Sequence, residues 1–149
     1  MTAGDPFDLD RFVHAQDEGG AYERALGELR RGRKTSHWMW FVFPQLAGLG
    51  RSAMAQRFAV ASVEEAVAYL GHPVLGPRLI ECAAAVADAP KGRSAESILG
   101  DVDAVKLRSS VTLFLRADPE RREFLRVLDR FFGGLPDPAT ERLLGGASV

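Results

Sequence analysis

Apolar side chains recur along most of the chain at the spacing of an amphipathic helix. The clearest example is a repeat at i, i+3, i+4 and i+7 that a glycine closes: Tyr22, Ala25, Leu26, Leu29 and Gly32. Similar patterns lie within residues 5–18, 52–59, 62–70, 72–89, 94–99, 101–117, 118–132 and 137–144. The chain is therefore predicted to be an all-α protein of about eight short helices.

The whole chain is expected to form a single compact domain. Its 149 residues suit one domain, and no repeat, linker or low-complexity tract divides them. A domain of this size buries about 70% of the surface of its unfolded chain. We expect the domain to span residues 1–149, with an ordered core over about 5–144 and fraying from residue 145 onwards.

Capping residues mark where most of these helices are expected to begin. Ser and Asp side chains accept hydrogen bonds from the free N–H groups of a first turn, and proline suits the first helical position. The expected caps are Asp5 or Asp8, Ser52, Ser62 in a capping box with Glu65, Ser94, Asp101 or Asp103, Asp118 before Pro119, and Asp137 before Pro138.

The densest aromatic segment, residues 38–43, is predicted to be a central helix. Six apolar residues are too few for periodicity to separate a buried strand from a buried helix. A lone strand would leave backbone groups unpaired in the core, and no second strand candidate lies nearby. Ser36 suits the N-cap position and Pro44 ends the element. A helix that is hydrophobic all round is expected to be surrounded by the others.

Composition and charge exclude several classes of protein. The net charge is −1, whereas nucleic-acid-binding domains are usually strongly basic, so nucleic acid is not expected as the main partner. No segment approaches the roughly 18 apolar residues of a membrane span, and residues 1–10 lack the apolar run of a signal peptide. The one cysteine, Cys82, cannot form a disulfide within the chain and sits among alanines, as a buried inert thiol does. A cytoplasmic protein is expected.

Polar side chains flank and interrupt the aromatic segment, which suggests that it lines a binding site. They are Lys34, Ser36, His37 and Gln45, and the rings among them are those of Trp38 and Trp40. His37 is the best candidate for a catalytic group, because an ordinary histidine pKa near 6.5 permits proton transfer or ligand contact. The alternative is a structural histidine that bonds to a backbone carbonyl.

Two nearby segments carry groups that favour an anion. In Gly48-x-Gly50-Arg51-Ser52, backbone N–H groups, a helix start and a guanidinium suit a phosphate or carboxylate. The alternative is an ordinary loop in which Ser52 is an N-cap, since the remaining residues of a dinucleotide or P-loop motif are absent. The basic run at residues 30–34 either complements the end of the preceding helix or also contacts an anion.

One helical face in the C-terminal half is also polar. Lys106, Ser109 and Ser110 share this face at i, i+3 and i+4. Two interpretations stay open: these groups complete a polar wall opposite His37, or the hydroxyls bond back to carbonyls of their own helix.

No metal site or cofactor is predicted. The three histidines, His14, His37 and His72, share no ligand spacing, and one cysteine cannot build a thiolate cage. His14 is expected at the surface, and His72 in a capping or packing role before Pro73. The GxSxG motif of a serine hydrolase is also absent.

A set of motifs runs through nearly the whole chain and supports a family resemblance. The motifs are Lys34-x-Ser36-His37-Trp38-Met39-Trp40-Phe41-x-Phe43-Pro44-Gln45, Gly48-Leu49-Gly50-x-Ser52, Glu65-Ala66-x-x-Tyr69-Leu70-x-His72-Pro73, Lys106-x-x-Ser109-Ser110-x-Thr112-Leu113-Phe114, Phe131-x-Gly133 and Asp137-x-x-Thr140. Val111 and Phe58 replace a methionine and a frequent tyrosine of the family pattern.

With these motifs the chain resembles the domain of unknown function 1810 family of small bacterial proteins. The resemblance implies an all-helical fold around one central helix, and it implies no activity. Some members carry the label calpastatin, a protease inhibitor whose inhibitory regions are disordered. The packed domain expected here gives that label no support.

Two functions follow as hypotheses. The first is a pocket that binds a small anionic or nucleotide-like ligand, with or without converting it. Its candidate residues are Lys34, Ser36, His37, Trp38, Trp40, Gln45, Arg51, Ser52, Lys106, Ser109 and Ser110. The alternative is a non-catalytic protein-interaction module whose aromatic segment is purely structural.

Overall fold

The structure, a computed structural model, describes residues 4–145 and is all-α, as the sequence predicts. Within these residues lie ten α-helices and one 3-10 turn, slightly more than the eight or so helices expected, and each α-helix corresponds to one of the segments predicted to be helical. They are α1 (Asp10–Asp17), η1 (Glu18–Gly20), α2 (Ala21–Arg31), α3 (Met39–Val42), α4 (Ala53–Arg57), α5 (Val63–Gly71), α6 (Leu75–Ala87), α7 (Ala95–Leu99), α8 (Asp101–Ala117), α9 (Arg122–Phe132) and α10 (Pro138–Leu144).

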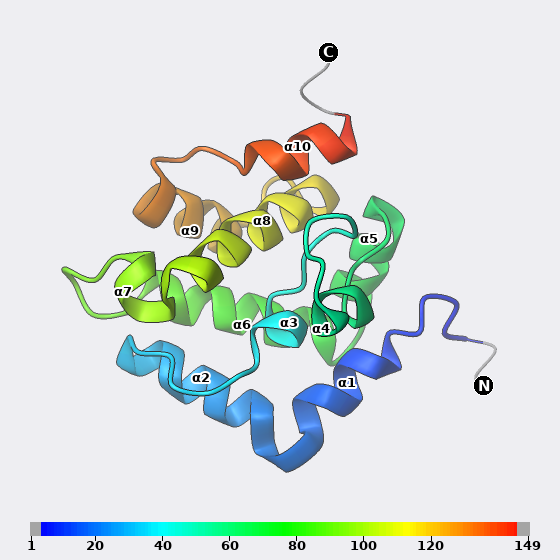
Figure 1. Ribbon diagram of the computed structural model, residues 1–149, viewed down its shortest axis with the longest axis horizontal. Coiled ribbons are helices and arrows are strands. Elements are labelled where there is room, and N and C mark those ends of the chain that lie inside the picture. The colour runs from blue at the N-terminus through cyan, green and yellow to red at the C-terminus, as the bar shows by residue number, and fades with distance from the viewer. Residues whose placement is uncertain (1–3, 146–149) are drawn as a thin grey trace.

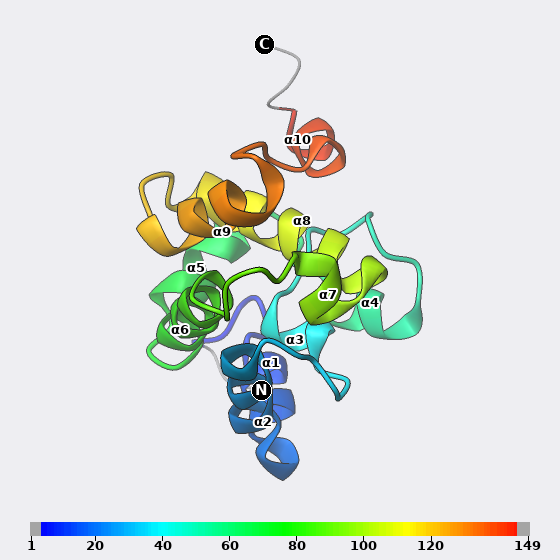
Figure 2. The ribbon, with the colours of Figure 1, turned by 90° about the vertical axis from the view of Figure 1, so that its left-hand side faces the viewer.

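Two helices organise the packing of the others. α8, with 17 residues, contacts α5, α7, α9 and α10, whereas α6 contacts α2, α5 and α9. Figures 1 and 2 show α3 between the α1–α2 pair on one side and the α7–α8 pair on the other. An isolated parallel bridge between Leu46 and Val60 closes the loop that carries α4. No helix in the described range is long and apolar enough to cross a membrane.

The aromatic segment forms the predicted central helix, but its first turn is built differently from the expectation. α3 is only four residues long, and Trp38 and Phe43 on either side of it are 1% and 0% exposed. Trp38, rather than Ser36, occupies the N-cap position. The Ser36 hydroxyl instead donates a hydrogen bond to Glu28 at 2.6 Å, so a partner from α2 takes it away from the helix start.

Four of the predicted caps are confirmed. Ser52, Ser62, Ser94 and Asp137 each accept a hydrogen bond from a backbone N–H of the first turn. In the expected capping box, however, Glu65 accepts from the N–H of Ala61 rather than from that of Ser62.

Three further cap predictions are wrong. The N-cap of α1 is Leu9, without a side-chain cap bond, rather than Asp5 or Asp8, and the Asp5 carboxylate accepts from the N–H groups of Leu9 and Asp10 from outside the helix. Gly100, which has a positive φ of 91°, is the N-cap of α8, and Asp101 and Asp103 lie inside its first turn. α9 begins at Arg122, not after Asp118, because the Asp118 carboxylate accepts a hydrogen bond from Arg121 Nε at 3.0 Å.

Residues 146–149, for which fraying is expected, lie outside the described range.

A buried polar network joins the first third of the chain to its middle. Gln16 on α1 is 1% exposed. Its Nε2 donates to the carbonyl of Phe41 at 2.8 Å and to the hydroxyl of Tyr69 at 3.3 Å. Its Oε1 accepts from Arg78 at 3.2 Å. The amide is thus satisfied by three separate segments, which a buried polar group requires.

Candidate functional site

Two lysines that are far apart in sequence meet at one carboxylate. Lys34 Nζ lies 3.0 Å from Asp103 Oδ2, and Lys106 Nζ lies 3.5 Å from Asp103 Oδ1. The three side chains are only 10%, 19% and 17% exposed, respectively. We call Lys34, Lys106 and Asp103 the lysine cluster. Two ammonium groups face one carboxylate, so one positive charge is left uncompensated within it.

Each lysine of the cluster also lies over an indole ring. Lys34 Nζ is 5.2 Å from the ring centroid of Trp38, and Lys106 Nζ is 5.1 Å from that of Trp40. These distances permit cation–π attraction. Trp38 is buried, whereas Trp40 is partly exposed. The partly accessible indole is therefore the one beneath Lys106.

Local structure explains why these groups meet. Asp103 and Lys106 are three residues apart on α8 and so share one face of the helix. Lys34 follows the end of α2 at Gly32, whose φ of 76° ends the helix in the left-handed region. The N–H of Lys34 then donates to the carbonyl of Ile98 on α7 at 2.7 Å, which places its side chain beside the start of α8.

Glu28, which the sequence analysis did not single out, fixes the segment that carries Lys34, Ser36 and Trp38. Its carboxylate is buried and accepts from the N–H groups of Thr35 and Ser36, the hydroxyl of Ser36 and the indole N–H of Trp38. Burial raises the pKa of this carboxyl, but the hydrogen bonds outweigh it and lower the pKa from 4.5 to about 2. The sequence signal that could have indicated this role is the position of a glutamate among the apolar residues of α2.

Of the two serine hydroxyls on α8, that of Ser109 bonds back to a carbonyl of its own helix, as one of the two interpretations expects; the polar wall opposite His37 stays a prediction. Ser109 Oγ donates to the carbonyl of Lys106 at 3.1 Å and accepts from Gln45 Nε2 at 2.7 Å, which connects the cluster helix to the segment after α3. Ser110 is fully buried, and its Oγ has no hydrogen-bond partner among the described residues. It lies one turn from Lys106 on the same helix.

The remaining predicted site residues lie outside these contacts. His37 is exposed, in a bend between Ser36 and Trp38. Arg51 is exposed, and Ser52 accepts from the N–H of Ala55 as an ordinary N-cap. Gly50 is required by packing, because a Cβ at this position would press against Ala55. The structure thus brings Lys34, Trp38, Trp40 and Lys106 together; the roles of His37 and Arg51 stay predictions.

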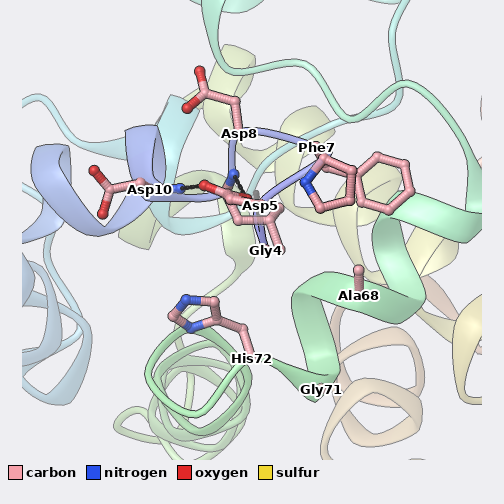
Figure 3. Close-up of a pocket in the computed structure, with 10 residues that line it drawn as sticks. Gly4, Asp5, Phe7, Asp8, Asp10, Ala68, Gly71 and His72 are labelled. Atoms are coloured by element: carbon pink, nitrogen blue, oxygen red, sulfur yellow. Dashed lines mark hydrogen bonds between the residues drawn. The ribbon is translucent and has the colours of Figure 1, made fainter. Parts of the chain in front are cut away.

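The larger of two described cavities lies elsewhere, between the N-terminal segment and the corner from α5 to α6. It has a volume of about 820 Å³ and is lined by Gly4, Asp5, Pro6, Phe7, Asp8, Leu9, Asp10, Ala68, Gly71 and His72. Figure 3 shows the His72 ring below Asp5, whose carboxylate accepts from the N–H groups of Leu9 and Asp10. The hydrogen bond from Leu9 is the main reason that the pKa of Asp5 is lowered.

Two polar side chains of this cavity, Asp5 and His72, accept hydrogen bonds from backbone N–H groups. His72 Nδ1 accepts from the N–H groups of Val74 and Leu75 at 3.1 and 3.2 Å, which confirms the expected capping role. The second cavity, of about 220 Å³, is lined by Arg30, Glu81, Ala84, Ala85 and Asp88. Neither cavity includes one of the candidate ligand-binding residues named for the first hypothesis, although Arg30 of the predicted basic run lines the second. Within residues 4–145, no three His, Cys, Asp or Glu side chains are grouped so as to hold a metal ion.

Comparisons with known proteins place the chain in a family. The family model described as "Protein of unknown function (DUF1810)" matches residues 6–144. The chain belongs to this family. The DUF1810 match covers α1 to α10, and so includes both the lysine cluster and Glu28.

A solved structure shows the same fold. The conserved hypothetical protein Rv1873 from Mycobacterium tuberculosis is 52% identical and has a TM-score of 0.90. The similarity covers 95% of this chain and 99% of that one. No match was found among curated proteins. The DUF1810 assignment therefore establishes family and fold, and the chemistry has to be argued from the side chains.

Proposed function

We propose that this protein binds a small anionic ligand at the lysine cluster. The observation that carries the proposal is the meeting of Lys34 and Lys106 at Asp103, with one ammonium charge in excess and little exposure to solvent. An anion gains more from a cation that is partly removed from water, because screening there is weaker. Lysine ammonium groups are point-charge donors that suit phosphate and carboxylate alike.

The partly exposed Trp40 favours a ligand that also has a planar group. An aromatic ring that stacks on an indole next to a bound anion is the arrangement that a nucleotide-like molecule would use. His37 is exposed and belongs to the same segment, so it is our candidate for proton transfer to or from such a ligand.

A thermal-shift screen with nucleotides, sugar phosphates and small carboxylates tests the proposal. A ligand at one hundred times its Kd stabilises a protein by about 2.7 kcal/mol, which for a domain of this size raises Tm by roughly 5–10 °C. Lys34→Gln and Lys106→Gln are each expected to abolish most of this shift. Lys91→Gln is the matched control, because Lys91 is exposed and lies in the loop after α6.

Two results would contradict binding at the cluster. One is a panel that leaves Tm unchanged at millimolar concentrations. The other is a ligand whose shift is equally large in the wild type, the two cluster variants and Lys91→Gln. His37→Ala then distinguishes ligand binding from proton transfer. A His37→Ala variant that binds the ligand but no longer converts it would assign the proton transfer to His37.

The alternative function, a protein-interaction module, is favoured by one separate observation. Val102 and Val105, near the start of α8, are 70% and 59% exposed, and they lie one turn apart on the helix. Exposed apolar side chains that lie together can form a surface on which proteins associate. A partner captured by the wild type but lost with Val105→Asp, together with a ligand screen that gives no shift, would favour this alternative.

A further inference from the structure

We infer that Asp103 occupies, in the unliganded protein, the place that the anionic group of the ligand takes on binding. This inference rests on the proposed function and specifies how the site is regulated. Asp103 is then an internal competitor, whose carboxylate holds the two lysines in position and has to turn away before an external anion can contact both.

The geometry of Asp103 is that of a bridging anion. Its two oxygens contact different ammonium groups, at 3.0 Å to Lys34 and 3.5 Å to Lys106, which come from segments about 70 residues apart. Among the described residues, neither lysine has a second carboxylate partner. One carboxylate that bridges two cations is the arrangement expected of a bound carboxylate or phosphate oxygen pair.

The nearby Glu28 carboxylate cannot take over this role. All four of its hydrogen-bond donors come from residues 35–38, and these contacts use both of its oxygens. It therefore anchors the chain beneath the cluster and leaves the lysine ammonium groups to Asp103. An incoming anion has one competitor to displace.

Displacement of Asp103 is chemically feasible within this fold. Asp103 is in the first turn of α8, where the free N–H groups and the helix dipole stabilise a carboxylate even without a cation. Its side chain is 17% exposed, and an aspartate reorients by rotation of χ1 alone. The carboxylate can thus leave the lysines and still lie in a favourable field at the edge of the cluster.

The experiment compares Asp103→Asn with Asp101→Asn. Both variants remove one carboxylate from the first turn of α8 and change the net charge equally, but Asp101 is exposed and has no ion pair among those described. Binding of inorganic phosphate, acetate and AMP is measured at constant ionic strength. Both tryptophans of the chain lie beneath the lysines, so intrinsic fluorescence reports directly on this site.

We expect Asp103→Asn to lower the Kd of the probe that binds best by about five- to tenfold, because a like charge is removed from beside the bound anion. Asp101→Asn is expected to leave the Kd within about twofold of the wild type, since Asp101 is exposed and charge interactions at the solvent-exposed surface are weak. A Kd that is unchanged or higher in Asp103→Asn, with clear binding in the wild type, would overturn the inference and leave the proposed function standing. No saturable binding in the wild type or in either variant would overturn both.

A measurement on the wild type covers the case in which Asp103→Asn does not fold. The side-chain carboxyl carbon of Asp103 is followed by NMR during titration with the same probe, together with the Nζ groups of Lys34 and Lys106. Displacement predicts that all three signals move with one Kd. Lysine signals that shift while the Asp103 carboxyl signal stays constant would show that the aspartate remains in place, contrary to the inference.

Discussion

Glu28 is a single side chain on which the conformation of a whole loop depends. Its carboxylate accepts four hydrogen bonds. They come from the backbone N–H groups of Thr35 and Ser36, the Ser36 hydroxyl and the Trp38 indole N–H. Burial of a carboxylate destabilises the folded state unless its oxygens accept hydrogen bonds. Here the loop supplies the donors. Ser36 therefore stabilises the loop as a donor to Glu28 and leaves the start of α3 uncapped.

The lowered pKa of Glu28 makes stability depend on pH. Because the folded-state pKa is about 2 and the ordinary value is 4.5, the stabilisation is complete above about pH 5 and is lost as pH falls towards 2. The difference corresponds to about 3 kcal/mol. We expect Glu28→Gln to lose about this much in urea unfolding at pH 7, and less than half as much at pH 3.

Glu23→Gln is the control for this measurement, since Glu23 lies on the same helix and is exposed. Its unfolding free energy is expected to stay close to that of the wild type at both pH values. If Glu28→Gln lowers the unfolding free energy equally at pH 7 and pH 3, the contribution of Glu28 comes from the packing of its side chain and not from its charge.

At the scale of elements, the helices were predictable where their signals are local. The side chains of Ser52, Ser94 and Asp137 cap within their own first turns, and Gly133 ends α9 with a φ of 62°. Such contacts need no partner from elsewhere. Asp118 failed as a cap because Arg121 competes for its carboxylate.

The candidate site was predictable in part, for the same reason. Lys34, Trp38, Trp40 and Lys106 stood out by their residue types and by the motifs around them. Asp103 was interpreted as a helix cap, because its pairing with Lys34 depends on how α7 and α8 sit against the loop after α2. Glu28 resembled any charged residue of an amphipathic helix. The roles of Asp103 and Glu28 both depend on contacts between segments that are distant in the sequence. The spacing of apolar residues along the chain gives no information about such contacts.

Gly76 illustrates a contact between elements that the sequence did not reveal. It lies in the first turn of α6, where a Cβ would overlap the carbonyl oxygen of Leu70 and approach its carbonyl carbon to 2.9 Å. Since the obstacle is backbone of α5, it cannot move without shifting a helix. We expect Gly76→Ala to lower the unfolding free energy by about 2 kcal/mol or more, measured by urea denaturation.

Gly71→Ala gives the matched comparison. Gly71 is the last residue of α5, and a Cβ there would meet nothing within 4 Å. Alanine is favoured over glycine in a helix by up to about 1 kcal/mol, so this variant is expected to be neutral or slightly stabilised. Equal destabilisation of the two variants would argue against a close contact at Gly76.

At the scale of the molecule, Cys82 reports on how the packed structure opens. The thiol is 0% exposed on α6, which contacts α2, α5 and α9, and burial raises its pKa to about 12. Only about one thiol in ten thousand would be a thiolate at pH 8 even if a reagent could reach it. Reaction with a disulfide reagent such as DTNB is therefore expected to require opening of the helix packing.

The rate of this reaction is the measurement. It is expected to be slow in buffer, to rise with urea along the unfolding transition, and to reach the rate of a free thiol in the unfolded chain. Rapid labelling in buffer, with far-UV circular dichroism unchanged, would show that α6 opens without the rest of the domain.

The Gln16 network has a consequence for how the protein is made. Gln16 reaches its partners at Phe41, Tyr69 and Arg78 only after those residues have left the ribosome, and the last of them follows 62 positions later in the chain. At a synthesis rate of about 5–20 residues per second, the N-terminal helix waits roughly 3–12 s for these partners. During that interval its apolar face, which carries Phe12, is accessible to chaperones and to other nascent chains. The translation rate over the first half of the messenger RNA therefore determines how long this face stays exposed.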